Sequence, residues 1–154
     1  PDLVRIYPAL VIRDTEMAEA FQAGTYKPYG LEEAVEISAK LLQGYEEAGV
    51  QVIRVGLQPT EEIQLGKEVL AGPFHPAFRE LCQGYLLAER IHQEEGDELL
   101  IRIGEKDLSK LYADKKRYFR PCLEKKKIQV EVVPGRLQGI MELIGQKKGG
   151  AICI

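Results

Sequence analysis

The sequence has no long apolar segment and only three cysteines. No apolar run approaches the roughly 20 residues that a membrane-spanning helix requires, so a transmembrane protein is excluded and we expect no membrane partner. Cys82, Cys122 and Cys153 lie 40 and 31 positions apart. This spacing matches no zinc or iron–sulfur ligand pattern, and the odd number argues against a disulfide framework. The sequence therefore predicts no metal site and a reducing, cytoplasmic location.

Familiar catalytic motifs are also absent. There is no GxSxG elbow, no P-loop, no GxGxxG after a strand and no HExxH. His75 and His92 lie 17 positions apart, which is not a metal-ligand spacing. His75 stands between Phe74 and Pro76 at the start of a predicted helix, where a loop histidine is the plain interpretation. We therefore predict no catalytic residue in this chain.

Charge is present in quantity but is divided unevenly. The 154 residues are 45% hydrophobic and 29% charged, which is typical of a globular chain large enough to bury a core. Residues 1–98 carry 18 acidic and 8 basic side chains, a net charge of −10, whereas residues 99–154 carry 6 and 13, a net charge of +7. This step predicts two modules, of which the second could meet an anionic partner. The alternative is that the lysines only form a solvated surface.

The first half reads as strand, helix, strand. Asp2–Tyr7 alternates apolar and polar residues, as a strand does. Leu31–Ala48 carries apolar residues at 3.6-residue spacing and is followed by Gly49, so it predicts a helix with a left-handed end. Val50–Leu57 is a second apolar strand, ended by Pro59. This order predicts the α/β class with parallel strands.

The second half reads as a smaller α+β unit. A helix is predicted from Pro76 to about Glu95. The sequence then predicts a β-α-β arrangement whose helix is interrupted near Pro121, with strands and helix at Glu98–Ile103, Leu108–Lys126 and Ile128–Val133. We therefore expect an α/β part at residues 1–75, a connecting helix at 76–96 and a basic α+β domain at 97–154. No element is predicted within residues 60–75 or 135–154.

Ligands of parallel α/β folds gather at the C-terminal ends of the strands. Gly56 would allow close approach of the backbone to a ligand, and Gln58 offers both a donor and an acceptor. Arg5 and Arg54 lie within the strands, and a buried arginine would need an anionic or carbonyl partner. The candidate cofactor- or substrate-binding residues are therefore Tyr7, Arg54, Gly56, Leu57 and Gln58.

Three segments carry a likeness to a known family. Pro1–Glu16, Tyr26–Leu42 and Val52–Pro59 resemble, in order and spacing, the late part of the radical SAM domain. The likeness is to the elongator catalytic-subunit branch and its bacterial relatives, which are often labelled anaerobic coproporphyrinogen oxidase-like. Ala71–Leu81 is similar to the connection that follows the barrel in those bacterial proteins. Together these segments cover roughly the first 80 residues.

The resemblance implies the C-terminal part of a (βα) radical SAM barrel. In the full-length parent, a [4Fe–4S] cluster and S-adenosylmethionine would lie at the C-terminal mouth, with Gly56 and Gln58 near the S-adenosylmethionine adenine or the substrate. The family binds its cluster through Cys-x3-Cys-x2-Cys, which this sequence lacks, so we expect neither cofactor in this piece alone. The start at Pro1 favours a piece excised from a longer protein. Its expected partners are the missing N-terminal barrel half and, through an exposed barrel edge, a second copy.

Three further interpretations stay open. One is a fragment of an anaerobic coproporphyrinogen oxidase-like oxidoreductase. Another is an RNA- or tRNA-binding accessory module, because the basic β-α-β unit is similar in outline to KH-type folds, although Ala113–Lys116 replaces the glycine loop. Its aromatic residues Tyr112, Tyr118 and Phe119 could stack on bases, with core packing favoured for at least two. Its predicted phosphate contacts are Lys115, Lys116, Arg117 and Arg120. The last is a domain that merely packs against the missing barrel half.

Overall fold

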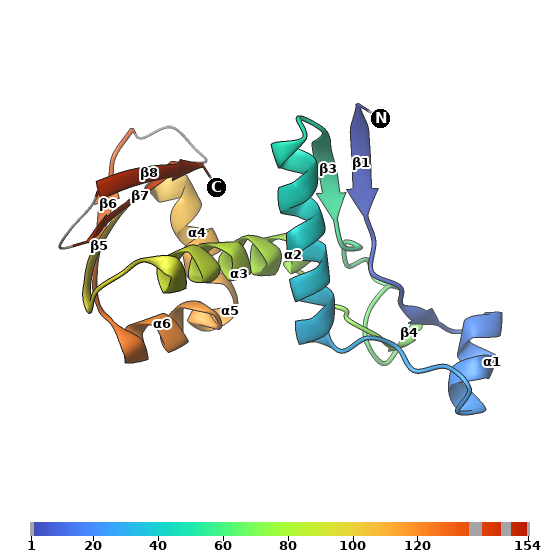
Figure 1. The fold of residues 1–154 in the computed structure, drawn as a ribbon. Coiled ribbons are helices and arrows are strands. Elements are labelled where there is room, and N and C mark those ends of the chain that lie inside the picture. The colour runs from blue at the N-terminus through green and yellow to red at the C-terminus, as the bar shows by residue number, and fades with distance from the viewer. Residues whose placement is uncertain (1, 136–139, 146–148, 154) are drawn as a thin grey trace. The chain divides into compact units, whose positions relative to one another are not determined.

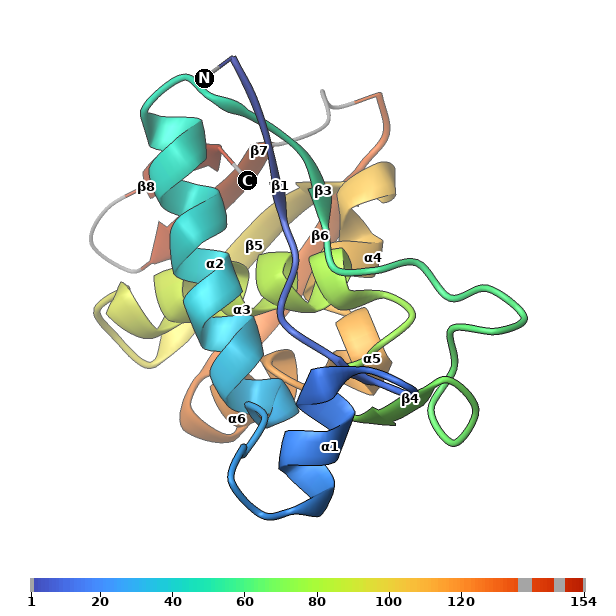
Figure 2. The same ribbon diagram turned by 90° about the vertical axis from the view of Figure 1, so that its right-hand side faces the viewer.

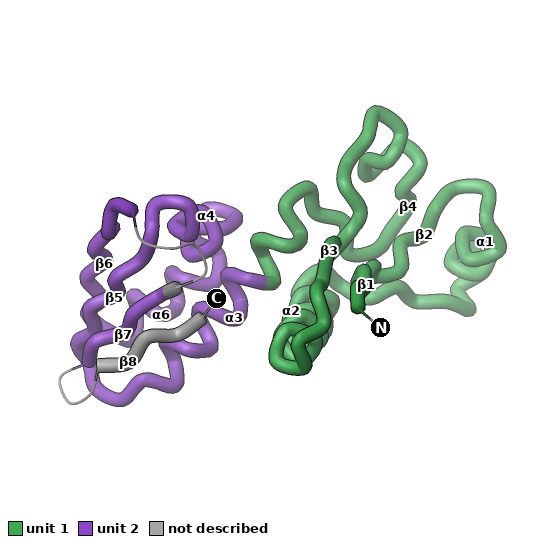
Figure 3. Tube along the Cα trace, turned by 90° about the horizontal axis from the view of Figure 1, so that it is seen from above, with its two compact units in different colours: residues 1–82 green, residues 83–154 purple. Residues whose placement is uncertain are grey.

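A computed structural model describes residues 2–135, 140–145 and 149–153 of the chain. The chain divides into two compact units, residues 1–82 and residues 83–154 (Figure 3). The division falls inside a helix, α3 (Phe78–Gln93), which the sequence predicted as a connection. No helix in the described part of the chain is long and apolar enough to cross a bilayer.

Unit 1 is built on a parallel β-α-β arrangement, as predicted. Strands β1 (Leu3–Ile6) and β3 (Gln51–Val55) pair in parallel, and helix α2 (Leu31–Glu47) connects them and covers one face (Figures 1 and 2). The helix buries a stripe of small and branched side chains, and the strands bury Ile6, Val52 and Val55. Gly49, just past the helix end, has a φ of +74°, the left-handed conformation that the sequence predicted.

Three short elements of unit 1 had no predicted counterpart. Helix α1 (Glu16–Gln22) begins after Thr15, whose Oγ1 accepts a hydrogen bond from the Ala18 backbone N–H. Strands β2 (Val11–Ile12) and β4 (Val69–Ala71) pair in antiparallel fashion. Two or three residues are too few to show an alternating pattern, so sequence periodicity could not reveal these strands.

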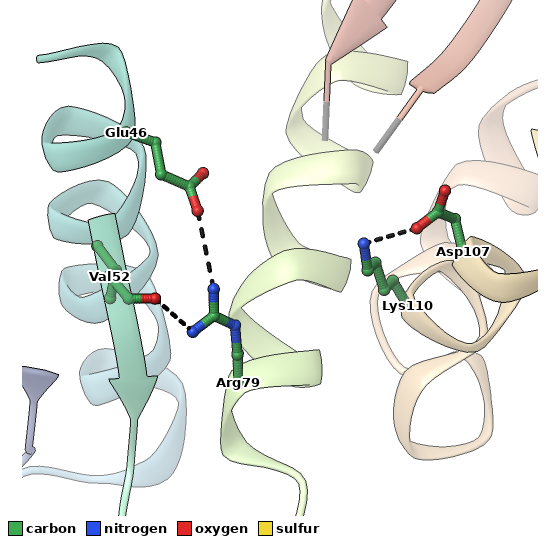
Figure 4. Close-up of polar contacts among 5 residues, drawn as sticks. All are labelled: Glu46, Val52, Arg79, Asp107 and Lys110. Carbon is green, nitrogen blue, oxygen red and sulfur yellow. Dashed lines mark hydrogen bonds and ion pairs between the residues drawn. The ribbon is translucent and has the colours of Figure 1, made fainter. Parts of the chain in front are cut away.

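Arg79 closes one edge of the parallel sheet. Its Nη1 donates to the Val52 carbonyl at 2.8 Å, and its Nη2 lies 3.8 Å from Glu46 Oε1 (Figure 4). In Figure 4 this contact approaches β3 from the side away from β1. The guanidinium therefore takes the place that a further strand would occupy next to β3.

Unit 2 is a four-stranded mixed sheet with helices. Its strand order is β6-β5-β7-β8, in which β5 and β6 are parallel and the other pairs are antiparallel. The strands are β5 (Glu98–Gly104), β6 (Lys127–Val133), β7 (Ile140–Gly145) and β8 (Gly149–Cys153). The predicted β5 and β6 strands and the β-α-β order are confirmed, and the structure adds that the two strands are parallel. Strands β7 and β8 occupy the tail, for which no element was predicted.

The connection between β5 and β6 is broken differently from the prediction. It consists of a 3₁₀ turn and three short helices: η1 (Glu105–Asp107), α4 (Leu108–Leu111), α5 (Ala113–Lys116) and α6 (Phe119–Lys125). The predicted interruption near Pro121 is wrong, because Pro121 lies in the first turn of α6, where its missing N–H costs no helical bond. The chain breaks instead within α5, at Asp114, Lys115 and Lys116, which all have positive φ.

The core of unit 2 lies between its helices and the sheet. Buried aliphatic residues from the second half of α3 and from β5 form its centre, together with Met141 and Leu143 of β7 and Phe119 and Cys122 of α6. One charged pair is also buried: Lys110 Nζ lies 2.6 Å from Asp107 Oδ1, and Asp107 is fully buried (Figure 4). Breaking such a pair would leave an uncompensated charge, so Lys110 is held inside the unit.

Candidate functional site

The C-terminal ends of β1 and β3 lie side by side, as parallel pairing requires. The Gly56 N–H donates to the Ile6 carbonyl at 2.8 Å, which holds the chain together where both strands end. A small depression with a cavity volume of about 10 Å³, roughly the space of one water molecule, opens there. Its lining comes from three stretches of unit 1: Pro8, Leu10, Gly56, Leu57, Pro73, Phe74, His75 and Phe78. Small-molecule pockets usually enclose about 300–1,000 Å³, so the described residues form at most part of a ligand site.

Gly56 is required by its surroundings. It is buried with a φ of +77°, and an added Cβ would lie 2.7 Å from the Cβ of Phe78. The close approach that the sequence predicted at Gly56 is therefore made by Phe78, a side chain of the same unit. A glycine directly after an apolar strand was the signal for a close neighbour, but the sequence could not say which residue that neighbour would be.

His75 is the titratable side chain among these lining residues. It is half-buried, and its Nδ1 accepts a hydrogen bond from the Ala77 backbone N–H at 3.1 Å. An accepting Nδ1 places the proton of the neutral ring on Nε2. The sequence had placed His75 in a loop at a helix start, and the structure adds its position beside Gly56.

The predicted site residues divide into two groups. Gly56 and Leu57 line the depression, whereas Tyr7, Arg54 and Gln58 do not and are exposed to solvent. Arg5 and Arg54 lie within β1 and β3, as the sequence predicted, but neither is buried, because α2 covers only one face of the two strands.

The described cysteines do not form a metal centre. Cys82 belongs to unit 1 and Cys122 to unit 2, and both are buried and free. Burial raises the pKa of the Cys82 thiol to about 12, and burial also raises the pKa of Cys122. No group of three His, Cys, Asp or Glu side chains able to hold a metal occurs within the described residues. The side chain of Cys153 lies outside them.

In unit 2 the predicted phosphate-binding residues lie on an unusual turn. Asp114, Lys115 and Lys116 adopt left-handed conformations in succession, with φ values of 45°, 56° and 66°. Such a conformation costs an L-residue roughly 1–2 kcal/mol. Two contacts accompany the turn: Lys116 Nζ lies 4.4 Å from the centre of the Tyr112 ring, and Arg117 Nη1 donates to Asp114 Oδ2 at 2.8 Å. The turn places Lys115 in solvent.

The basic side chains of unit 2 are not equally available. Lys116 and Arg117 make the internal contacts of the turn, whereas Lys115 and Arg120 are exposed. Several other basic residues form hydrogen bonds or ion pairs within the unit: Arg102, Lys110, Lys126 and Lys127.

The aromatic residues of this segment pack inward. Tyr118 meets Tyr85 edge-on with ring centres 5.6 Å apart, and Tyr112 lies 5.8 Å from Phe119. Phe119 is part of the core, and both tyrosines pack against it. These contacts favour core packing over base stacking for all three predicted stacking residues.

Comparison with known proteins finds a family match for the first unit. The family model described as "Radical_SAM C-terminal domain" matches residues 1–87. Over 37 residues the chain is 60% identical to the tRNA uridine(34) acetyltransferase of Methanocaldococcus jannaschii and 54% identical to that of Methanocaldococcus infernus. Each match spans 24% of this chain and 7% of the relative, so the chain matches only a small part of these proteins. No solved structure matches this chain significantly.

Proposed function

We propose, from the premise that this chain belongs to the Radical_SAM C-terminal domain family, that it is the C-terminal portion of a radical SAM enzyme. In this role β1, α2 and β3 supply the last part of the enzyme's parallel sheet, and unit 2 is an accessory domain. The family's name implies S-adenosylmethionine and an iron–sulfur cluster for a full-length member. The match of the family model over residues 1–87 is the observation that carries the proposal.

The two edges of the β1–β3 pair support this role. Arg79 occupies the outer side of β3 through the Val52 carbonyl. Within the described residues, β1 pairs with β3 alone, so its other side offers backbone groups to a further strand. In the β1–β3 pair, Arg79 covers the outer edge of β3, and the outer edge of β1 can accept another strand. This arrangement is expected for strands at the end of a larger parallel sheet. The preceding strand of a longer protein, or a second copy, would join at β1.

The described residues do not fit the cluster itself. A [4Fe–4S] cluster needs cysteine thiolates, and Cys82 is buried with a pKa of about 12. We therefore assign cluster binding to the part of the enzyme that would precede this chain. We place Gly56 and Leu57 at the strand ends that face the shared S-adenosylmethionine or substrate site, with Tyr7, Arg54 and Gln58 on the exposed surface around it.

The two relatives suggest the substrate class. Both are named tRNA uridine(34) acetyltransferases, so we propose that the parent acts on tRNA. Neither relative lends support to the coproporphyrinogen oxidase-like alternative or to a bacterial origin. Because the match covers 7% of each relative, the acetyltransferase activity itself is not carried over.

Anaerobic reconstitution tests this proposal. This chain alone, treated with iron and sulfide, should acquire no [4Fe–4S] absorbance. The segment that precedes it in the parent reading frame should acquire a cluster, and the two together should release 5′-deoxyadenosine from S-adenosylmethionine. Near-stoichiometric cluster loading on this chain alone would contradict the proposal, as would equal release by the preceding segment without this chain.

A second function for unit 2 is favoured by the exposed cations Lys115 and Arg120. We propose that this unit helps to hold RNA through phosphate contacts at Lys115 and Arg120, whereas Lys116 and Arg117 keep the internal contacts of the turn. Two such contacts on a single strand predict a log–log salt slope of about −1.4, at about −0.7 per phosphate. Fluorescence anisotropy with tRNA at several salt concentrations measures that slope.

Variants separate this binding from general charge effects. Lys115→Glu with Arg120→Glu should weaken tRNA binding and flatten the salt slope, because both residues are exposed. Lys27→Glu makes a like change at an exposed site in unit 1 and should preserve the slope. Unchanged binding by the double variant would leave these lysines and arginines as a solvated surface.

A further inference from the structure

Two arginines stand next to each other on the uncovered face of the β1–β3 sheet. Arg5 and Arg54 are direct partners in the parallel register, after an irregularity that makes Ile53 an extra residue. Neighbouring strands lie about 4.7–4.9 Å apart, and residues side by side on parallel strands point to the same face. Val4 and Ile6, which alternate with Arg5, are the more buried residues of β1, so Arg5 points away from α2.

Both guanidinium groups are exposed, and neither has a hydrogen-bond or ion-pair partner among the described residues. By contrast, Arg79 binds a backbone carbonyl and Arg102 binds Glu131. Like charges directly opposite each other on a sheet repel and destabilise the pairing. A bound anion would remove this repulsion by accepting hydrogen bonds from both side chains.

The surroundings of the pair are apolar and aromatic. Leu3 is 54% exposed, Tyr7 45% and Ile53 41%, and all three belong to or directly follow the same two strands. Leu3 and Tyr7 alternate with Val4 and Ile6 and so share the face of Arg5. An exposed face with two cations among an aromatic ring and branched side chains suits a ligand that has both a charged group and a flat or apolar body.

We propose that Arg5 and Arg54 together bind the phosphate group of a nucleotide on this face. Two guanidiniums carry two positive charges, which a phosphate monoester neutralises with a charge of about −1.5 to −2 at pH 7. Its three oxygens can accept from both forks, whereas a carboxylate brings one charge and two oxygens. This monoester can belong to a free nucleotide or to the terminal phosphate of an RNA strand, and the base would lie against Leu3, Tyr7 or Ile53. This site rests on the proposed function, because Tyr7 and Arg54 border the same substrate side of the sheet. Phosphate binding itself needs neither a cluster nor unit 2, so its failure is distinct from a failure of the reconstitution test.

Titrations of the whole chain at low salt identify the ligand class. The probes are inorganic phosphate, adenosine monophosphate, a short single-stranded oligoribonucleotide, sodium acetate and S-adenosylmethionine. Calorimetry gives the dissociation constants, and NMR follows the Nε–H signals of Arg5 and Arg54. We expect phosphate and adenosine monophosphate to shift both signals, with the monophosphate binding more tightly through its base. Acetate or S-adenosylmethionine binding as tightly as the monophosphate would overturn the phosphate assignment.

The two phosphate sources are told apart by the position of the phosphate. At equal phosphate concentration, a site for a free nucleotide should bind adenosine monophosphate more tightly than the oligoribonucleotide. A site for an RNA strand should bind the oligoribonucleotide more tightly. Either preference supports the pair as a phosphate site. Equal weak binding of all five probes, without shifts at either arginine, would overturn it.

Variants test the pair itself. Arg5→Gln and Arg54→Gln should each weaken adenosine monophosphate binding about tenfold or more, since each removes charge-assisted hydrogen bonds. The lysine variants keep the charge but lose the fork, so they should fall between wild type and the glutamine variants. Lys27→Gln removes a charge from another exposed position of unit 1 and should leave binding unchanged. Circular dichroism checks that the variants fold. An equal loss of adenosine monophosphate affinity in Lys27→Gln would show that net charge, not the arginine pair, causes the effect.

Discussion

Replacing Gly56 by alanine should damage the end of the β1–β3 sheet more than the same change elsewhere. Gly56 has a φ of +77°, and a Cβ would lie 2.7 Å from the Phe78 Cβ and 3.0 Å from two of its ring atoms. Real Cβ atoms essentially never approach so closely, and Phe78 is itself buried. The alanine must therefore displace the ring and the start of α3.

Two contributions set the magnitude. The left-handed backbone costs an alanine roughly 1–2 kcal/mol, and overpacking a buried site costs a further 1–3 kcal/mol or so. Gly56→Ala should thus lower the free energy of unfolding by roughly 2–5 kcal/mol. Gly49→Ala is the matched control, because Gly49 has a φ of +74° and nothing within 4 Å of an added Cβ. It should cost only the backbone contribution, about 1–2 kcal/mol.

Urea denaturation followed by circular dichroism measures both variants. Hydrogen exchange of the Gly56 amide, which bonds the Ile6 carbonyl, reports on unit 1 specifically if the two units unfold separately. Equal losses of stability in the two variants, within about 0.5 kcal/mol, would refute the packing of Phe78 against Gly56.

Substitutions at Lys115, Arg79 and Cys82 test three other features of the structure. Lys115→Gly should raise the free energy of unfolding of unit 2 by roughly 1 kcal/mol, because glycine adopts the left-handed conformation without strain. Lys125→Gly in α6 should lower it by about 1 kcal/mol. Urea denaturation measures both, and a change in the same direction for the two variants would contradict this. Arg79→Leu should cost about 1.5–3 kcal/mol through the lost hydrogen bond to Val52, and unchanged hydrogen exchange along β3 would argue against edge closure. Cys82 should make stability fall between pH 9 and about 12, because its thiol ionises in the unfolded chain before it ionises in the folded one. Cys82→Ala should remove that loss, and an unchanged pH profile in the variant would contradict the burial of the thiol.

The β-α-β order of both units, and the parallel pairing in unit 1, could be predicted because their signals are local. In Leu31–Glu47 the apolar residues recur at helical spacing, and the flanking strands alternate or run apolar. A connection of crossover length that contains a helix then favours parallel pairing. The candidate ligand residues Gly56 and Leu57 followed from the same rule, since the carboxyl ends of parallel strands must meet at one edge.

The rest of the site depended on residues that are distant in sequence. Phe78 and His75 reach the strand ends from the start of α3, more than 15 positions after Gly56. The exposure of Arg5 and Arg54 depended on how much of the sheet is covered. A strand pattern shows which residues share a face, but it cannot show whether a second layer lies on that face.

By itself the sequence determined the uneven distribution of charge and the order of the main strands and helices, because these depend on composition and on short-range periodicity. Only the tertiary structure decided where the chain between β5 and β6 breaks. Local preference places the break at Pro121 and favours glycine for left-handed turns, yet Asp114, Lys115 and Lys116 adopt that conformation. Within unit 2 the backbones of α3 and α4 lie close together, since a Cβ at Gly84 would lie 2.8 Å from the Lys110 carbonyl oxygen. The burial of Phe119 and Cys122, which follow the turn and belong to the core, offsets the strain of its left-handed residues.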